Sequence, residues 1–157
     1  IDVCMNLVDE LHAVSTALVG AGIRHAICGG IAVTIYGATR TTKDIDILVS
    51  PDDLDRALDV VRPLGYKFAA LPMMFEEGTP RERHVQRVSK ILHGDHLVVD
   101  FLLEMGAFKG FLAGSFEVKT AAGPLFVIAR DVLLEMKRMA GRPQDAADIE
   151  KLEAADE

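Results

Sequence analysis

One short segment, Asp44–Val49, limits what this chain can fold into. Its residues alternate like those of a β-strand, so one face is wholly apolar while Asp44 and Asp46 share the other. Two like charges at this spacing repel each other, and burying either carboxylate costs several kcal/mol unless a positive group compensates it. The strand must therefore turn this face to solvent or hold a cation on it.

The segments around this strand predict further strands with helices packed on them. Apolar residues recur at helical spacing from Val3 to Leu18, and Ser50-Pro51 is a strong helix start. In chain order we expect a helix over 3–18, a strand over 25–28, a helix over 31–36, a strand over 44–49, a helix over 51–61, a strand with a loop over 66–80, strands over 85–92 and 97–103, a hairpin over 116–128 that turns at Gly123-Pro124, and helices over 132–140 and from about 145. This order predicts an α/β or α+β fold, a mixed β-sheet with helices packed on it.

Length and composition set the coarse limits. The 157 residues can bury an ordinary core, and we expect a single domain over 1–157 with C-terminal helices from about 130 packed on it. No apolar run is long enough to span a membrane, and the two isolated cysteines predict reduced thiols in the cytoplasm. The net charge of −7 argues against a protein whose whole surface binds nucleic acid, although a local basic groove would still bind it.

A third carboxylate extends the chemistry of the first two. Asp100 interrupts the apolar run LVVDFLL, and it joins Asp44 and Asp46 if their strands are neighbours. Such a cluster raises its own pKa values unless divalent cations keep it ionised, and Mg²⁺ suits a few carboxylates completed by water and substrate phosphate. We therefore expect these residues to bind two Mg²⁺ ions, or Mn²⁺, as in phosphoryl and nucleotidyl transfer.

The glycine pair Gly29-Gly30 fits the phosphate end of such a site. It stands between a short apolar strand and a short helix, where backbone N–H groups can approach a phosphate closely. Each feature alone has an ordinary structural explanation: a solvated pair of acids, a tight turn, or an acid that accepts hydrogen bonds within a sheet. Their combination favours a catalytic nucleotide site.

Together these residues resemble a known family. The glycine pair, the run RTTKDIDILV over 40–49 and the later VVDFLL over 98–103 are similar to the motifs of the nucleotidyltransferase superfamily related to DNA polymerase beta. The tail DVLLEMKRMAGRPQDAADIEKL over 131–152 resembles the end of its small bacterial branch, which includes AbiEii-type toxins of toxin–antitoxin pairs. The resemblance extends from Cys28 to about Leu152, is weakest over 66–87, and implies the nucleotidyltransferase fold.

The resemblance implies a reaction and assigns its residues. An acceptor hydroxyl would attack the α-phosphate of a nucleoside triphosphate such as ATP, and pyrophosphate would leave. By this resemblance Asp44 and Asp46 hold the metal ions, while Asp100 completes the site on the acceptor side and could receive the proton. The residues that it implies for nucleotide binding are Gly29, Gly30, Arg40, Thr42, Lys137 and Arg142.

Two departures from the family pattern bear on substrate recognition. Many relatives have Gly-Ser where this chain has Gly29-Gly30, so a serine contact to phosphate is missing while backbone contacts remain. We also expect the chain to lack the substantial C-terminal helical domain that helps larger relatives hold the acceptor. The acceptor is therefore the least determined part of the reaction.

Two kinds of acceptor molecule remain as alternatives, and a third alternative is a protein that is not an enzyme. The segment Thr79–His96 holds four arginine and lysine residues beside the Asp100 strand, which suits RNA, for example tRNA, although a solvated strand face and loop explains it slightly better. The acidic net charge instead suits a cationic small molecule such as an antibiotic. The leading expectation is a Mg²⁺-dependent, toxin-like nucleotidyltransferase acting on RNA, with an antitoxin protein as partner. The alternative is a non-catalytic nucleotide- or partner-binding module, which the presence of all three carboxylates argues against.

Overall fold

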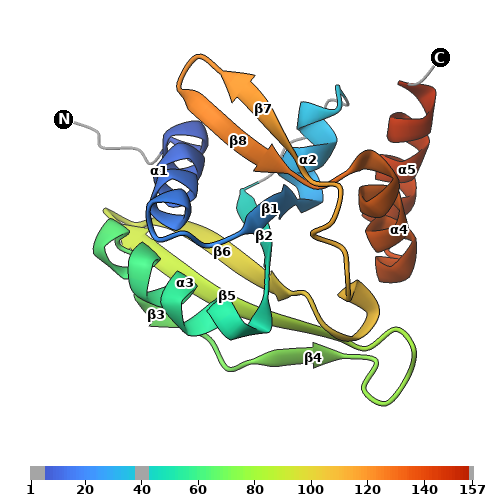
Figure 1. Ribbon diagram of the computed structural model, residues 1–157, viewed down its shortest axis with the longest axis horizontal. Helices are drawn as coiled ribbons and strands as arrows, with labels where there is room; N and C mark the ends of the chain where they lie inside the picture. The colour runs from blue at the N-terminus through green and yellow to red at the C-terminus, as the bar shows by residue number, and fades with distance from the viewer. Residues whose placement is uncertain (1–5, 38–42, 156–157) are drawn as a thin grey trace.

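The strand that carries the two aspartates lies in the middle of a mixed sheet. A computed structural model of the chain describes residues 6–37 and 43–155, and Figure 1 shows the sheet with helices on both sides. Strand β2 (Asp44–Val49) pairs antiparallel with β1 (His25–Cys28) and parallel with β6 (Asp95–Leu103). The predicted α/β class with a mixed sheet is therefore confirmed.

Within residues 6–37 and 43–155, further strands extend the sheet to eight. β5 (Arg83–Leu92) joins β6 through a two-residue turn at His93-Gly94, where both residues have the positive φ that such a hairpin turn requires. Two short strands form within residues 66–80, where a strand and a loop were expected. The order across the sheet is β3 (Phe68–Ala69), β5, β6, β2, β1, β8 (Gly123–Val127) and β7 (Phe116–Thr120), and β4 (Met73–Phe75) also pairs with β5.

The helices form two groups, one at each end of the view in Figure 1. On the left, α1 (Leu7–Gly20) contacts α3 (Leu54–Val61). On the right, α4 (Arg130–Ala140) contacts both α5 (Pro143–Ala154) and α2 (Gly29–Ile35), the helix that directly follows β1. Short 3-10 helices cover Pro51–Asp53, Arg62–Leu64 and Gly106–Phe108. Among the described residues, no helix has the length and hydrophobicity that crossing a membrane requires.

The apolar face of β2 lies at the centre of the core. Ile47 is fully buried between its register partners Ile27 on β1 and Phe101 on β6, and Ile45 and Val49 are fully buried on the same face. Burying each such side chain stabilises the fold by roughly 1.5–3 kcal/mol. Because side chains alternate along a strand, Asp44 and Asp46 point to the opposite face, as the sequence predicts.

Several boundaries differ from the expectations, and two of the differences have a clear physical reason. The hairpin over 116–128 turns at Ala121-Ala122, not at Gly123-Pro124, and Gly123 and Pro124 lie in β8. A proline fits there because it pairs with Lys119 next to the closing pair of a two-residue turn. This is a position of the antiparallel ladder that needs no N–H toward β7. The last helix begins at Pro143 instead of about 145, since proline is favoured in the first turn.

Candidate active site

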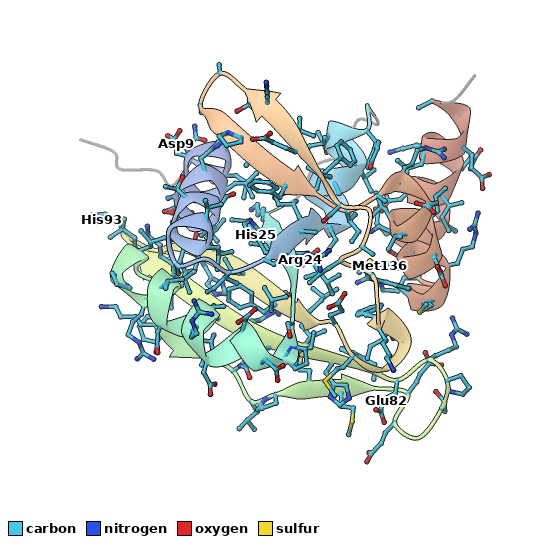
Figure 2. All side chains as sticks on the ribbon, in the orientation of Figure 1. Asp9, Arg24, His25, Glu82, His93 and Met136 are labelled. Atoms are coloured by element: carbon cyan, nitrogen blue, oxygen red, sulfur yellow. The ribbon has the colours of Figure 1, made fainter. Side chains whose placement is uncertain are left out.

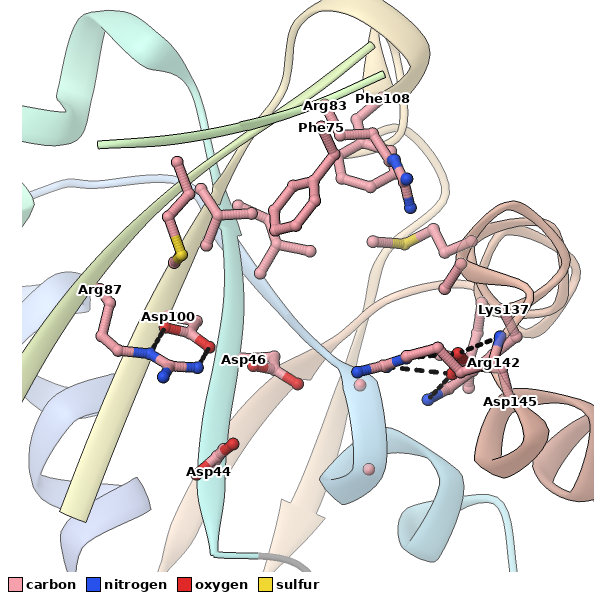
Figure 3. Close-up of a pocket in the computed structure, with 18 residues that line it drawn as sticks. Asp44, Asp46, Phe75, Arg83, Arg87, Asp100, Phe108, Lys137, Arg142 and Asp145 are labelled. Carbon is pink, nitrogen blue, oxygen red and sulfur yellow. Dashed lines mark hydrogen bonds and ion pairs between the residues drawn. The ribbon is translucent and has the colours of Figure 1, made fainter. Parts of the chain in front are cut away.

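Residues from four adjacent strands form one row across the sheet. Cys28 on β1 pairs with Asp46 on β2. Asp46 pairs with Asp100 on β6, which pairs in turn with Arg87 on β5. Residues that pair directly in a sheet point to the same face, so these side chains project together. Asp44, two residues before Asp46, shares that face, and the structure thus brings the three predicted carboxylates to one place (Figure 3).

Asp46, Asp100 and Arg87 of this row form one wall of a pocket of about 470 Å³ with two unlike ends. The charged end contains the three carboxylates (Figure 3), and Gly29, which lies against Asp46, lines the pocket together with Gly30. The other end is lined mainly by apolar side chains, namely Met73, Phe75, Val85, Leu102, Phe108, Leu133 and Met136, together with Arg83. A pocket built this way suits a ligand that has both a charged and an apolar part.

Asp46 is the carboxylate with the least compensation. Burial, and then the negative charges of Asp100 and Asp44, raise the pKa of Asp46 to about 7, although Lys137 and Arg142 oppose the shift. Within the described part of the chain, no hydrogen bond or ion pair reaches its carboxylate. Near neutral pH this group therefore takes up or releases a proton readily, and a bound cation would hold it ionised.

The backbone at Gly29 approaches Asp46 so closely that no side chain fits between them. Its φ of 65° lies in the left-handed region, and a Cβ atom there would lie 1.9 Å from Asp46 Oδ2. Gly29 begins α2, and both Gly29 and Gly30 line the pocket. A glycine is thus required at position 29 by the geometry of the carboxylate wall, while the contact of Gly29 and Gly30 with phosphate stays a prediction.

Asp100 has a strong partner that the sequence did not single out for the site. Arg87 Nε and Nη2 donate hydrogen bonds to Oδ1 and Oδ2 of Asp100, each at 2.9 Å. These bonds raise the pKa of Arg87 above its already high ordinary value. The sequence contained a usable signal, because Arg87 and Asp100 lie on two strands joined by a tight turn. The exact register was needed to pair them.

Lys137 and Arg142, the two cations predicted for the triphosphate, both line the pocket and both bind acids of α5. The buried Lys137 Nζ lies 3.1 Å from carboxylate oxygens of Asp145 and Asp148, which are themselves fully buried. Arg142 Nε donates to Asp145 Oδ2 at 2.7 Å, while most of its side chain is exposed (Figure 3). Burial raises the pKa of Asp145, but the hydrogen bonds from Arg142 and Lys137 outweigh burial and hold it below its ordinary value.

The cations of the segment Thr79–His96 do not gather into one basic groove. Figure 2 shows Glu82 and His93, near the two ends of this segment, at opposite ends of the molecule. Each of the four cations is engaged by an acid or a carbonyl: Arg81 by Met139, Arg83 by Glu76, Arg87 by Asp100, and Lys90 by Glu10. The segment is therefore a strand face and loop with paired charges.

Two of the residues implied for nucleotide binding, Arg40 and Thr42, lie outside the described residues. Over 6–37 and 43–155, no three His, Cys, Asp or Glu side chains form a group arranged to hold a metal ion. At the candidate site, Asp100 directs both carboxylate oxygens to Arg87. Asp44 and Asp46 nevertheless fit Mg²⁺, which is commonly bound by one or two carboxylates and completed by substrate phosphates.

Several solved structures share this fold. The lincosamide antibiotic adenylyltransferase LnuA, solved with lincomycin bound, matches with a TM-score of 0.60 and 14% identity over 94% of this chain and 96% of its own. A candidate nucleotidyltransferase of Thermotoga maritima matches with a TM-score of 0.60 and 14% identity over 92% and 90%. ANT(2")-Ia in complex with adenylyl-2"-tobramycin matches with a TM-score of 0.59 and 17% identity over 94% and 86%. No protein-family model and no curated protein matches the sequence.

These likenesses establish the nucleotidyltransferase fold that the sequence motifs predict. At identities of 14–17% they are likenesses of fold, so the function has to be argued from the site itself. The more specific resemblance to AbiEii-type toxins stays a prediction.

Proposed function

We propose that this chain is a metal-dependent nucleotidyltransferase, which moves a nucleoside monophosphate from a nucleoside triphosphate to an acceptor hydroxyl. The observation that carries the proposal is Asp46, which lies beside Asp44 and Asp100, has a pKa of about 7, and has no hydrogen bond within the described residues. A carboxylate left in this condition in a pocket indicates a function that brings a cation to it. The likeness to solved nucleotidyltransferases supports the same reaction.

Asp44 and Asp46 are the proposed ligands of Mg²⁺ or Mn²⁺, with Asp100 as a third. Gly29 lacks the side chain that would collide with Asp46 Oδ2, so the carboxylate keeps its place in the pocket, and carboxylate oxygens are the donors that these ions prefer. Two such ions, when bound, neutralise developing negative charge and lower the pKa of the attacking hydroxyl.

The triphosphate is proposed to lie at the charged end of the pocket, between the glycine pair and the C-terminal helices. Gly29 and Gly30 offer backbone there, and Arg142 offers a side chain that is 69% exposed. Lys137 contributes less, because two buried carboxylates already compensate its charge. Arg40 and Thr42 stay proposed contacts from the segment before β2.

Asp100 is the proposed acceptor of the proton. As the acceptor oxygen bonds to the α-phosphorus, the bond from that phosphorus to pyrophosphate breaks, and the hydroxyl proton moves to the carboxylate. Asp100 stands at the boundary between the two ends of the pocket, since Leu102 continues the same face of β6 into the apolar end. An acceptor held in the apolar end would present its hydroxyl there.

The geometry favours a small molecule as that acceptor. The apolar end suits a ring or another apolar body, and the cations of Thr79–His96 are already paired. One similar structure is an antibiotic adenylyltransferase with lincomycin bound, and another holds adenylyl-2"-tobramycin. RNA, including tRNA, in a toxin-like reaction with an antitoxin partner is the second candidate, and the tail over 131–152 favours it.

Transfer of a labelled nucleotide tests the proposal. The protein is incubated with each α-³²P-labelled nucleoside triphosphate and Mg²⁺ or Mn²⁺, with total RNA in one arm and hydroxyl-bearing antibiotics in the other. We expect label on an acceptor in one arm and a loss of about 100-fold or more in Asp46→Asn. The control Asp59→Asn changes an exposed acid on α3 and should leave transfer unchanged. Nucleotide binding by folded protein without transfer in either arm would contradict the enzymatic proposal and favour a non-catalytic binding module.

A further inference from the structure

We propose that Arg87 is a positioning residue that holds Asp100 and competes with a divalent cation for that carboxylate. This inference rests on the proposed function, because it assigns regulation to the same site. Its direct basis is the pair of 2.9 Å hydrogen bonds from Nε and Nη2 of Arg87 to the two oxygens of Asp100. Such a two-point contact fixes both the position and the orientation of the carboxylate.

The sheet holds the two residues opposite each other. The β5–β6 ladder is continuous from the pair Val85–Leu102 to the pair Leu92–Asp95, and Arg87 faces Asp100 within it. The Asp100 side chain is 11% exposed, whereas the Arg87 side chain is 41% exposed. The arginine side chain is therefore the part that can move, while the carboxylate stays in place on the sheet.

The contact between Arg87 and Asp100 reduces the electrostatic repulsion within the group of three acids. Asp44, Asp46 and Asp100 share one face, and Arg87 pairs with Asp100 while Asp46 is left with its raised pKa. Arg87 is attracted by all three acids, most strongly by Asp100. It thus offsets part of the repulsion among the acids in the way a metal ion would.

A cation that binds Asp100 must share at least one carboxylate oxygen with Arg87, which weakens the hydrogen bond that this oxygen accepts. It must also approach a guanidinium of like charge, which costs further free energy. The other basic residues that line the pocket engage different acids: Arg83 pairs with Glu76, and Lys137 and Arg142 with Asp145. Competition for Asp100 is thus a specific consequence of Arg87.

Binding of Mn²⁺ to the protein alone, measured by calorimetry and by electron paramagnetic resonance, tests the competition. We expect Arg87→Met, which keeps much of the stem and removes the charge, to bind Mn²⁺ about tenfold more tightly than the unaltered protein. Arg87→Lys keeps the charge but cannot make the two-point contact, and its affinity should fall between the two. The control Arg83→Met removes a pocket cation that is paired with Glu76 and should change the affinity less than about twofold.

A second measurement shows whether the effect acts through Asp100. In an Asp100→Asn background, Arg87→Met should lose most of its gain in Mn²⁺ affinity, because the contested carboxylate is gone. Thermal unfolding of every variant accompanies the titrations, so that a misfolded protein is recognised and the comparison uses Arg87→Lys when Arg87→Met does not fold.

The outcomes separate this inference from the proposed function. Mn²⁺ binding that is equal or weaker in Arg87→Met overturns the competition and leaves the metal-dependent reaction standing. A gain of the same size in Arg83→Met also overturns it, because that result would reflect general charge. No Mn²⁺ binding by any folded variant removes the metal site, and the inference fails with it.

Discussion

Two groups of acids meet at one pocket, and the fold compensates them differently. The helix cluster consists of Asp145 and Asp148 on α5, both fully buried, with Lys137 of α4 at 3.1 Å from each. The strand cluster consists of Asp44, Asp46 and Asp100, and within it Asp46 has no hydrogen bond or ion pair in the described part of the chain. Lys137 lies against both acids of the first cluster, whereas in the second Arg87 binds Asp100 and leaves Asp46 without such a bond within the described residues.

The pKa values express the same difference. Burial raises the pKa of both Asp46 and Asp145, but Arg142 and Lys137 reverse the effect at Asp145, whereas Asp100 and Asp44 add to it at Asp46. An acid whose partners lie within the fold stabilises the fold, and an acid without them carries a cost that a ligand can relieve. The comparison therefore separates a structural cluster from a candidate functional one.

The largest effect should come from removing the cation of the helix cluster. Lys137→Met leaves two buried carboxylates without their lysine, and we expect a loss of about 3–5 kcal/mol in the free energy of unfolding, measured with urea. The matched control is Arg138→Met on the same helix, whose partner Glu153 is exposed, and it should cost less than about 1 kcal/mol. Equal losses in the two variants would show that the helix cluster is not held by Lys137.

In the strand cluster, by contrast, removing the charge of Asp46 should raise the free energy of unfolding. The pKa of Asp46 is raised from 3.8 to about 7 in the fold, so the wild-type protein loses stability as the pH rises between these values. At pH 8 without metal, Asp46→Asn should be more stable than wild type by at most about 4 kcal/mol, with little difference near pH 4. Urea unfolding at both pH values measures this, and added Mg²⁺ should stabilise wild type more than the variant. A wild-type stability that is flat between pH 4 and 8 would contradict the contrast.

A smaller effect is expected at the glycine beside Asp46. Gly29→Ala adds a Cβ against Asp46 Oδ2, whereas Gly22→Ala adds one in open space at nearly the same φ, 70° against 65°. Both variants bear the cost of a left-handed alanine, about 1–2 kcal/mol. Gly29→Ala should lose more stability than Gly22→Ala and should bind Mn²⁺ more weakly than wild type. The difference in stability between the two variants measures the cost of the close contact between position 29 and Asp46. If the two variants lose the same stability, the glycine is needed for its φ alone.

The smallest loss of stability is expected at Arg81, on the β4–β5 hairpin that contributes residues to the apolar end of the pocket. Arg81 Nη2 donates to Met139 O at 2.6 Å and so links the β4–β5 hairpin to the last turn of α4. Because Arg81 is exposed, Arg81→Ala should cost less than about 1 kcal/mol overall. Amide hydrogen exchange should nevertheless become faster over residues 76–82. Unchanged exchange there would mean that the hairpin holds its position without this link.

Much of the fold followed from local patterns. The alternation of Asp44–Val49 predicted a strand with one apolar face, and the structure buries that face completely at Ile45, Ile47 and Val49. The β5–β6 hairpin was also predictable, because His93-Gly94 is a turn signal between two apolar runs. The turn of the last hairpin was predicted wrongly, because glycine and proline mark turns only by tendency, and here the register places both in β8.

The sequence by itself determined the acids, the glycine pair and the strands that carry them, because side-chain alternation and charge repulsion act over a few residues. It could not determine that Arg87 faces Asp100, since a shift of one residue in the β5–β6 register would turn Arg87 to the other side of the sheet. It also could not show that Lys137 is compensated by two acids of the next helix. Tertiary structure decided which charges are paired within the fold and which are left for a ligand, because pairing depends on distances between elements that local sequence does not fix.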